Sequence, residues 1–290
     1  MPGQKLSEIR TLLATAGLAR QHHFGQNFLI DLNLMRKLVA AGEVSAADTI
    51  LEVGPGTGSL TEFLLARGAR VVAVEIDHGL QALLRERLGG DPHFTLVQGD
   101  ALGGKHQVNP LVLTTLRAQS PEPGGAYKLI ANLPYQIATP LLMDLLLVRP
   151  RFERMTCTIQ REVGERLAAE PRTDAYGPAS VVVQTLAETT LQAIITAAAF
   201  WPRPKVESVM LTIRPRPPES IDVGEVPAFV AFVQRAFQQR RKVLRRLLRN
   251  WDEAQALQAF QRAKVSPEAR PEELAPPAWR ALFRAVHREA

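Results

Sequence analysis

The chain has 290 residues, 46% of them hydrophobic, with a formal net charge of +6. That length is enough for one substantial core and a smaller second one. No apolar run approaches the roughly eighteen residues that cross a bilayer, and no signal-peptide core is evident, so we expect a cytoplasmic protein with no membrane anchor. The single cysteine, Cys157, excludes an internal disulfide, and the six histidines show no ligand spacing, so we expect no metal.

Helical patterns at residues 6–16 and 32–41 come first, and strand and helix patterns then alternate from residue 49 to about 187. This alternation predicts an α/β domain in which a mostly parallel sheet is covered by helices on both faces.

The first predicted strand, residues 49–53, runs into Gly54, Gly56 and Gly58 and then into a helical pattern. Glycines let the backbone turn tightly and lie close to a ligand, where a Cβ would intrude. The third glycine of a dinucleotide fingerprint would fall at position 59, which is serine here. The loop therefore predicts a nucleotide-type pocket for which pyrophosphate is not the best match.

Two further predicted strands end near a carboxylate. Residues 71–76 carry Glu75 about twenty positions past the glycines, where ribose hydroxyls are typically held. Residues 94–97 lead into Asp100, which can accept a hydrogen bond from an adenine amine. Each carboxylate alone is typical of a solvated strand end, but suitable groups at three successive strand ends favour one nucleoside site.

A fourth apolar run, residues 127–131, ends in Asn132-Leu133-Pro134-Tyr135. The Asn132 amide oxygen and the Leu133 carbonyl can each accept a hydrogen bond from an aromatic amine, which favours a pyramidal and more nucleophilic nitrogen. Pro134 stiffens the turn, and Tyr135 offers a flat face to a base. Asn-x-Pro is also ordinary turn chemistry, so the tetrapeptide alone leaves both interpretations open.

The predicted sheet continues beyond this turn. Residues 155–159 predict a strand that buries Cys157, and residues 189–196 and 206–213 predict a closing antiparallel pair. Residues 214–218, Arg-Pro-Arg-Pro-Pro, interrupt the pattern and give predicted domains 1–217 and 218–290.

The tail carries most of the basicity. Residues 222–290 hold thirteen Lys and Arg against eight Asp and Glu, which is +5 and leaves +1 for the rest. Apolar residues from Phe229 to Leu247 recur at helical spacing, with Arg241, Arg245 and Arg249 one turn apart. One packed and one cationic face are predicted. A solvated helix face is the alternative, and the density of positive charge favours phosphate contacts with folded RNA.

Taken together, these motifs resemble the Rossmann-like class I methyltransferases acting on adenine N6, and more closely the bacterial 16S rRNA dimethyladenosine transferases. The resemblance runs from about residue 15 to the C-terminus and implies a seven-stranded sheet with a small all-α C-terminal domain. Its further matches are Gly25-Gln26-Asn27-Phe28-Leu29, Tyr176-Gly177, Phe200-x-Pro202-x-Pro204-Lys205-Val206-x-Ser208 and Arg240-Arg241-Lys242-x-Leu244-Arg245.

The family's activity implies S-adenosyl-L-methionine as cofactor and methyl transfer to two adjacent adenines in the 3′-terminal hairpin loop of 16S rRNA. It also implies a role in small-subunit biogenesis, and we expect a monomer. Cofactor contacts are expected from Asn27, Leu29, Gly54, Gly56, Glu75, Asp100 and Asn132. Catalytic contacts with the base are expected from Asn132, Leu133, Pro134, Tyr135 and Phe200. RNA contacts are expected from Arg240, Arg241, Lys242, Arg245, Arg246 and Arg249.

Some alternatives stay open at this stage. Phe200, held out by nearby prolines, is expected to stack on the base opposite Tyr135, and the less favoured alternative is that it belongs to the core. A ribosome-assembly factor that binds RNA without methyl transfer is disfavoured because every expected pocket residue is present. A dinucleotide oxidoreductase is disfavoured by Ser59 and by the Asn132 motif. An adenine in large-subunit rRNA is a related target, and the basic tail favours the small subunit.

Overall fold

The computed structural model describes residues 2–18, 27–104, 107–217, 223–249 and 252–287. Gly25 and Gln26 of the N-terminal motif and Pro218 of the predicted linker lie outside these ranges. The chain forms two compact units, one of residues 1–164 and 190–214 and the other of residues 165–189 and 215–290. The predicted boundary at 217/218 misses residues 165–189, which join the second unit because the helix at Pro178–Leu186 contacts the C-terminal helices.

The first unit has the alternating strands and helices that the sequence predicts. Its helices are α1 (Leu6–Thr15), α2 (Leu32–Ala41), α3 (Ser59–Leu65), α4 (His78–Leu88), α5 (Pro110–Ala118) and α6 (Ala138–Leu145). Its strands are β1 (Phe28–Leu29), β2 (Thr49–Val53), β3 (Arg70–Glu75), β4 (Phe94–Gln98), β5 (Leu102–Gly104), β6 (Gln107–Val108), β7 (Tyr127–Asn132), β8 (Phe152–Gln160), β10 (Phe200–Trp201) and β11 (Ser208–Pro215). Three elements cross the boundary between the units: α7 (Arg161–Leu167), β9 (Ala187–Ile195) and β11, whose last residue, Pro215, belongs to the second unit.

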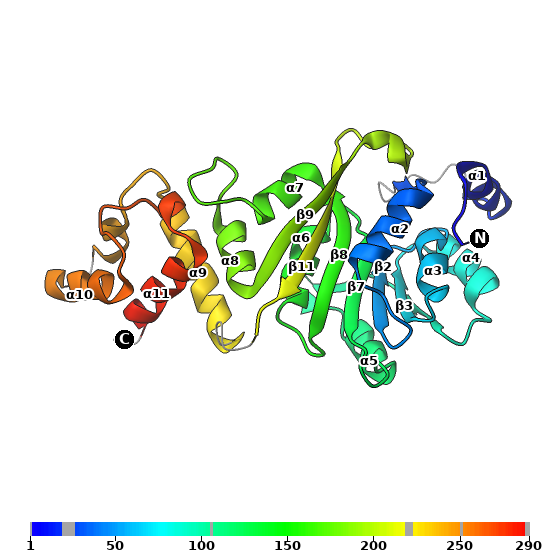
Figure 1. The fold of residues 1–290 in the computed structure, drawn as a ribbon, viewed down its shortest axis with the longest axis horizontal. Coiled ribbons are helices and arrows are strands. Elements are labelled where there is room, and N and C mark those ends of the chain that lie inside the picture. The colour runs from blue at the N-terminus through cyan, green and yellow to red at the C-terminus, as the bar shows by residue number, and fades with distance from the viewer. Residues whose placement is uncertain (1, 19–26, 105–106, 218–222, 250–251, 288–290) are drawn as a thin grey trace. The chain divides into compact units, whose positions relative to one another are not determined.

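Seven strands form one sheet in the order β4-β3-β2-β7-β8-β11-β9 (Figure 1). The pairs from β4 through β8 are parallel, and β11 pairs with β8 antiparallel. Helices α2 and α3 contact each other over the sheet, while α4 and α5 both contact β3 and β4. The prediction of a mostly parallel seven-stranded sheet is confirmed.

Burial explains why these strands read as continuous apolar runs. Every residue of β2 is buried, and so are the middle residues of β3 and β7, as expected for parallel strands covered on both faces. Cys157 lies in β8 with none of its surface exposed, as predicted. The edge strands β4 and β9 are more exposed.

The second unit is helical, with α8 (Pro178–Leu186), α9 (Val226–Phe237), α10 (Glu253–Ala263) and α11 (Pro276–His287). Aromatic side chains fill its core, with the Phe229 and Phe283 ring centroids 5.4 Å apart and those of Phe232 and Trp279 6.1 Å apart. Tyr176, part of a family motif, is fully buried here and donates its hydroxyl to the Leu274 carbonyl at 2.7 Å. The prediction of a small all-α C-terminal part is confirmed.

The predicted cationic helix through Arg241, Arg245 and Arg249 is wrong. Helix α9 ends at Phe237, residues 238–242 form turns, and Val243 has extended backbone dihedrals (φ −70°, ψ 149°). A 3₁₀ helix at Leu244–Leu248 follows and buries Leu244 and Leu248. Apolar spacing continued through the break, so the sequence pattern concealed it. No described helix is long and apolar enough to span a membrane.

A buried ion pair ties the start of the sheet together. The Lys128 Nζ, on β7, donates to Asp48 Oδ2 at 2.8 Å and to the Glu43 carbonyl at 2.7 Å. The Asp48 carboxylate also accepts from the backbone N–H groups of Ser45 and Ala126. Burial works against its charge, but these hydrogen bonds outweigh it and lower the pKa of Asp48. The pair anchors the loop before β2 to β7.

Replacing Asp48 with alanine should destabilise the protein by about 3 to 5 kcal/mol, because the Lys128 ammonium is left buried without its anion. Urea unfolding followed by circular dichroism measures this. Glu86, exposed on α4, is the matched control, and Glu86→Ala should change the free energy of unfolding by less than about 0.5 kcal/mol. Equal effects of the two substitutions would show that the ion pair does not stabilise the fold.

Candidate active site

The site lies at the carboxyl ends of the parallel strands. The strand order reverses between β2 and β7, because the chain adds β3 and β4 on one side and then returns to place β7 on the other. Ligands of open α/β sheets bind at such switch points. A cavity of about 340 Å³ opens there. Its lining includes all the predicted cofactor residues, namely Asn27, Leu29, Gly54, Gly56, Glu75, Asp100 and Asn132.

The loop after β2 forms a backbone cradle. Gly54 and Gly56 have positive φ values of 70° and 60°, which L-residues with side chains rarely adopt. A Cβ on Gly56 would lie 2.9 Å from the Phe28 ring, and one on Gly54 would lie 3.2 Å from Pro134. Both conformation and space therefore require glycine at these two positions, and the backbone itself lines the cavity.

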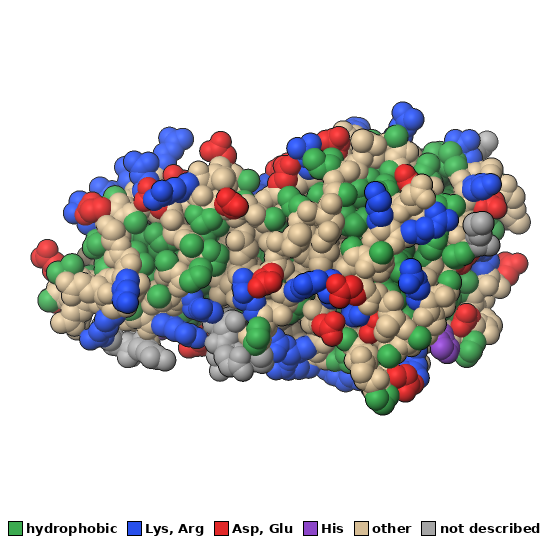
Figure 2. All heavy atoms as spheres, viewed as in Figure 1, with side chains coloured by type: hydrophobic (Ala, Val, Ile, Leu, Met, Phe, Trp, Pro, Cys, Tyr) green, Lys and Arg blue, Asp and Glu red, His purple; other side chains and the backbone are tan. Residues whose placement is uncertain are grey.

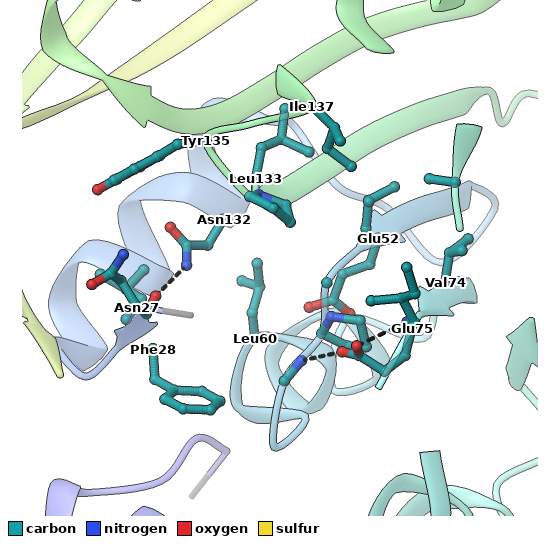
Figure 3. Close-up of a pocket in the computed structure, with 18 of the residues that line it drawn as sticks. Asn27, Phe28, Glu52, Leu60, Val74, Glu75, Asn132, Leu133, Tyr135 and Ile137 are labelled. Carbon is teal, nitrogen blue, oxygen red and sulfur yellow. Dashed lines mark hydrogen bonds between the residues drawn. The ribbon is translucent and has the colours of Figure 1, made fainter. Parts of the chain in front are cut away.

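Glu75 is the last residue of β3. Its Oε1 accepts from the backbone N–H groups of Ile76 and Asp77, both at 2.9 Å, and its Oε2 accepts a longer bond of 3.4 Å from Gly56 (Figure 3). Only 3% of the residue is exposed. Burial, only partly offset by these hydrogen bonds, raises the pKa of Glu75 to about 7.

Glu52, in the middle of buried β2, is a lining residue that the sequence analysis missed. It is 1% exposed, and its Oε2 accepts from the Thr61 hydroxyl at 2.7 Å. Burial, reinforced by the nearby Glu75 charge, raises the pKa of Glu52 to about 8. The available signal was a lone acid inside an otherwise apolar strand that leads directly into the glycine loop.

The charge of the lining indicates the kind of ligand. Among the described residues, the cavity is lined by three carboxylates, Glu52, Glu75 and Asp100, and by no Lys, Arg or His. Asp100 also accepts from the backbone N–H of Leu102. This set of acceptors suits a nucleoside with a cationic centre better than a pyrophosphate, whose charge would be repelled. The described residues include no group of three or more His, Cys, Asp or Glu that could hold a metal.

The bend Asn132-Leu133-Pro134-Tyr135 forms another wall of the cavity. Asn132 Nδ2 donates to the Asn27 carbonyl at 2.9 Å, and Asn132 Oδ1 accepts from the Thr158 hydroxyl at 2.5 Å. The half-buried Tyr135 shares a 2.7 Å hydrogen bond between its hydroxyl and that of Ser208. Figure 3 shows the Tyr135 ring beside the Asn132 amide.

Phe200 does not lie beside the cavity, although the sequence analysis predicts that it stacks on the target base. It pairs with Leu29 across the β1–β10 ladder, is 1% exposed, belongs to the hydrophobic core and does not line the cavity. The antiparallel pairing turns Phe200 inward and leaves the next residue, Trp201, stacked on Phe28 at a centroid distance of 6.3 Å. In this conformation Phe200 is core, so of the two residues predicted to stack on a base only Tyr135 lines the cavity, and Phe28 is a further aromatic residue of the described lining.

The predicted RNA-binding residues fall into three groups. Arg240 is engaged by the Glu272 carboxylate and by the carbonyls of Thr173 and Asp174, and Arg245 pairs with Glu268 at 3.0 Å. Lys242, Arg246 and Arg249 instead line a second cavity, of about 260 Å³, in the helical unit. Arg235, which the sequence analysis did not select, lines it too, and its described lining holds no carboxylate. Arg241 is exposed outside it.

Comparison with known proteins gives a consistent result. Residues 18–287 match the family model for ribosomal RNA adenine dimethylase. The chain is 39% identical over 278 residues to the ribosomal RNA small subunit methyltransferase A of Moorella thermoacetica, covering 94% of this chain and 93% of that protein. It is 40% identical over 264 residues to the protein of the same name from Magnetococcus marinus, covering 89% and 91%.

Solved structures are similar over most of the chain as well. The crystal structure of the 23S rRNA methyltransferase ErmE matches with a TM-score of 0.67 and 26% identity, covering 90% of this chain and all of that one. A dimethyladenosine transferase from Plasmodium falciparum matches with a TM-score of 0.72 and 23% identity, covering 90% and 98%, and shows the same fold.

Glu75 should make the stability of the protein without ligand depend on pH. Its pKa of about 7 lies above its usual value near 4.5, so the folded state holds the proton more tightly than the unfolded chain. Stability should therefore fall as pH rises from about 4.5 to about 7. Glu75→Gln should remove this component, ~3 kcal/mol, in urea unfolding at a series of pH values. Glu86→Gln is the control and should leave the pH dependence of stability unchanged. If Glu75→Gln also left it unchanged, the pH dependence could not be attributed to Glu75.

Proposed function

The chain belongs to the ribosomal RNA adenine dimethylase family, and we propose that it methylates N6 of two adjacent adenines in the 3′-terminal hairpin loop of 16S rRNA. The methyl donor is S-adenosyl-L-methionine, and the modification is part of small-subunit biogenesis in the cytoplasm. The protein acts as a monomer. The observation that carries this proposal is the Asn132 amide, locked beside Tyr135 on the wall of a cavity whose described lining has carboxylates and no cation.

The cavity fits the cofactor. S-adenosyl-L-methionine supplies an electrophilic methyl group on a sulfonium centre. Glu75, at the end of β3, would accept hydrogen bonds from the ribose hydroxyls, and Asp100 would accept from the adenine amine. Gly54 and Gly56 leave room beside the backbone, and Asn27 and Leu29 close the cavity from β1 and the residue before it.

The target adenine would enter beside Tyr135. Extruding a stacked base costs a few kcal/mol, and less from a loop than from a duplex. Stacking on one aromatic face returns about 1 to 3 kcal/mol. With Phe200 in the core, Tyr135 would be the one remaining face of the predicted pair, and stacking on a single face favours an adenine that is already unpaired. A hairpin loop presents such adenines.

The Asn132 amide oxygen and the Leu133 carbonyl would accept hydrogen bonds from the two N–H groups of the target amine. Acceptors placed in this way draw the nitrogen out of the ring plane and localise its lone pair. The methylated nitrogen is a strong acid that loses its proton to water, so no general base is required. Catalysis then comes mainly from alignment of the lone pair with the methyl group.

The function is tested by incubating the protein with labelled S-adenosyl-L-methionine and unmethylated small ribosomal subunits. Large-subunit RNA serves as the alternative substrate. Mass spectrometry should locate dimethylated adenines in the 3′-terminal hairpin of 16S rRNA. Asn132→Ala should lower kcat by about 10² to 10³, as for the loss of a preorganised polar group, with a much smaller change in cofactor affinity by calorimetry. RNA binding without methyl incorporation by the wild type would refute the proposal and indicate an assembly factor.

We also propose that the second cavity holds phosphates of the RNA backbone. Lys242, Arg246 and Arg249 come from the turn and 3₁₀ segment after α9, and Arg235 comes from α9 itself, where it donates to the Leu247 carbonyl at 3.1 Å. Lys and Arg side chains also gather on the visible surface of the helical unit in Figure 2. Phosphate contacts of this kind position a protein on folded RNA without reading its sequence.

Converting Lys242 and Arg246 together to glutamine should weaken binding to 16S rRNA and make its salt dependence shallower. The slope of log K against log salt should fall by between about 1 and 2, since each phosphate contact contributes about 0.7 to 0.9. Filter binding across a salt series measures it. Arg67 and Arg85, exposed in the first unit, form the charge-matched control pair for the same substitution. A slope that changes equally in both pairs would refute the phosphate site.

A further inference from the structure

We infer that Thr158, on β8, is a positioning residue that permits the second methyl transfer to the same nitrogen. This inference rests on the proposed function, because it concerns how many methyl groups the site adds. Thr158 is fully buried and does not line the cavity. It acts on the substrate through Asn132, which faces it across the β7–β8 ladder.

Thr158 holds both halves of the bend. Its hydroxyl donates to Asn132 Oδ1 at 2.5 Å, and its carbonyl accepts from the Leu133 backbone N–H at 3.1 Å. The other end of the Asn132 amide is tied to the Asn27 carbonyl. A flipped amide would set its oxygen against that carbonyl, and this repulsion disfavours the flip even though the Thr158 hydroxyl could accept from the NH₂ group. The amide orientation is therefore fixed, with one lone pair of Oδ1 used by Thr158 and one left for the substrate.

The two transfers place different demands on this oxygen. In the first, the N6 lone pair forms a bond to the methyl carbon, the C–S bond electrons return to sulfur, and the resulting ammonium loses a proton to water. The amine begins with two N–H groups, one for Asn132 Oδ1 and one for the Leu133 carbonyl. Before the second transfer only one N–H remains, so one acceptor must face the first methyl group.

The structure favours Asn132 Oδ1 as the acceptor that faces the methyl group. It keeps the Thr158 hydroxyl as a donor when the substrate N–H is gone. Within the described residues, the Leu133 carbonyl accepts no hydrogen bond, so losing the substrate N–H would leave it without a protein donor. A polar group buried without a partner is costly. The remaining N–H therefore stays on Leu133, and Thr158 offsets the loss at Asn132.

Removing the Thr158 hydroxyl should therefore slow the second transfer more than the first. In Thr158→Val, Asn132 Oδ1 can still accept from an unmethylated amine, but it has no donor when it faces a methyl group. The ratio of second to first rate constants should fall about tenfold, which corresponds to ~1.4 kcal/mol. Single-turnover reactions on unmethylated small subunits, digested to nucleosides, should show N6-methyladenosine accumulating where the wild type makes N6,N6-dimethyladenosine.

Three further variants separate this role from a structural one. Thr158→Ser keeps the hydroxyl and should restore the wild-type ratio, and Thr158→Ala should repeat the effect of valine if the larger side chain impairs folding. Thr156, two residues earlier on β8, is the matched control because its hydroxyl pairs with Thr212 and not with the site. Thr156→Val should keep the wild-type ratio. Thermal unfolding and calorimetric cofactor binding, measured on every variant, should be close to wild type.

The outcomes distinguish the inference from the function on which it depends. A wild-type protein that adds no methyl to adenine refutes the proposed function. If the wild type makes dimethyladenosine but Thr158→Val and Thr158→Ala slow both transfers equally, or leave both unchanged, the inference alone is overturned. A Thr158→Ser variant that behaves like Thr158→Val would overturn it too, because the hydroxyl would then not be the active feature.

Discussion

The Asn132 amide donates to the Asn27 carbonyl and accepts from the Thr158 hydroxyl, and these two bonds join segments more than a hundred residues apart in the chain. Asn27 precedes β1, which closes one wall of the cavity, and Thr158 belongs to β8. The orientation of the amide therefore depends both on the cavity wall at β1 and on the pairing of β7 with β8. The position of the acceptor oxygen depends on the same two features. A target amine bound as proposed would therefore meet an acceptor whose orientation is already fixed by folding, with no further loss of side-chain entropy.

Burial at the carboxyl ends of the strands gives the same cavity its charge preference. Glu52 and Glu75 are almost fully buried, and burial raises the pKa of both, so in the empty site they hold their protons up to about neutral pH, where an exposed carboxyl is ionised. A cationic ligand changes this, because its charge stabilises the ionised carboxylates. The burial of these two acids would in this way favour a ligand with a positively charged centre over a phosphate.

The sequence predicted what depends on local pattern. Strands β2, β3 and β7 are buried on both faces, so their apolar runs gave their positions to within one residue, and the glycines and Glu75 followed from their places at the strand ends. Features set by non-local pairing were missed or misplaced. Phe200 points into the core because β10 pairs with β1, and Arg240 is engaged by Glu272 and by residues 173 and 174. No spacing in the sequence records those partners.

The break after α9 shows why a pattern can be correct about which residues are buried and wrong about geometry. Apolar residues at helical spacing bury Leu244 and Leu248 in either an α-helix or a turn followed by a 3₁₀ helix. On a straight helix, Arg241, Arg245 and Arg249 would form one open stripe. The break instead turns Lys242, Arg246 and Arg249 toward Arg235 and makes a concave cavity. Because like charges that converge in a hollow raise the local positive potential, the broken segment would attract an anion such as the proposed phosphate more strongly than an open stripe would.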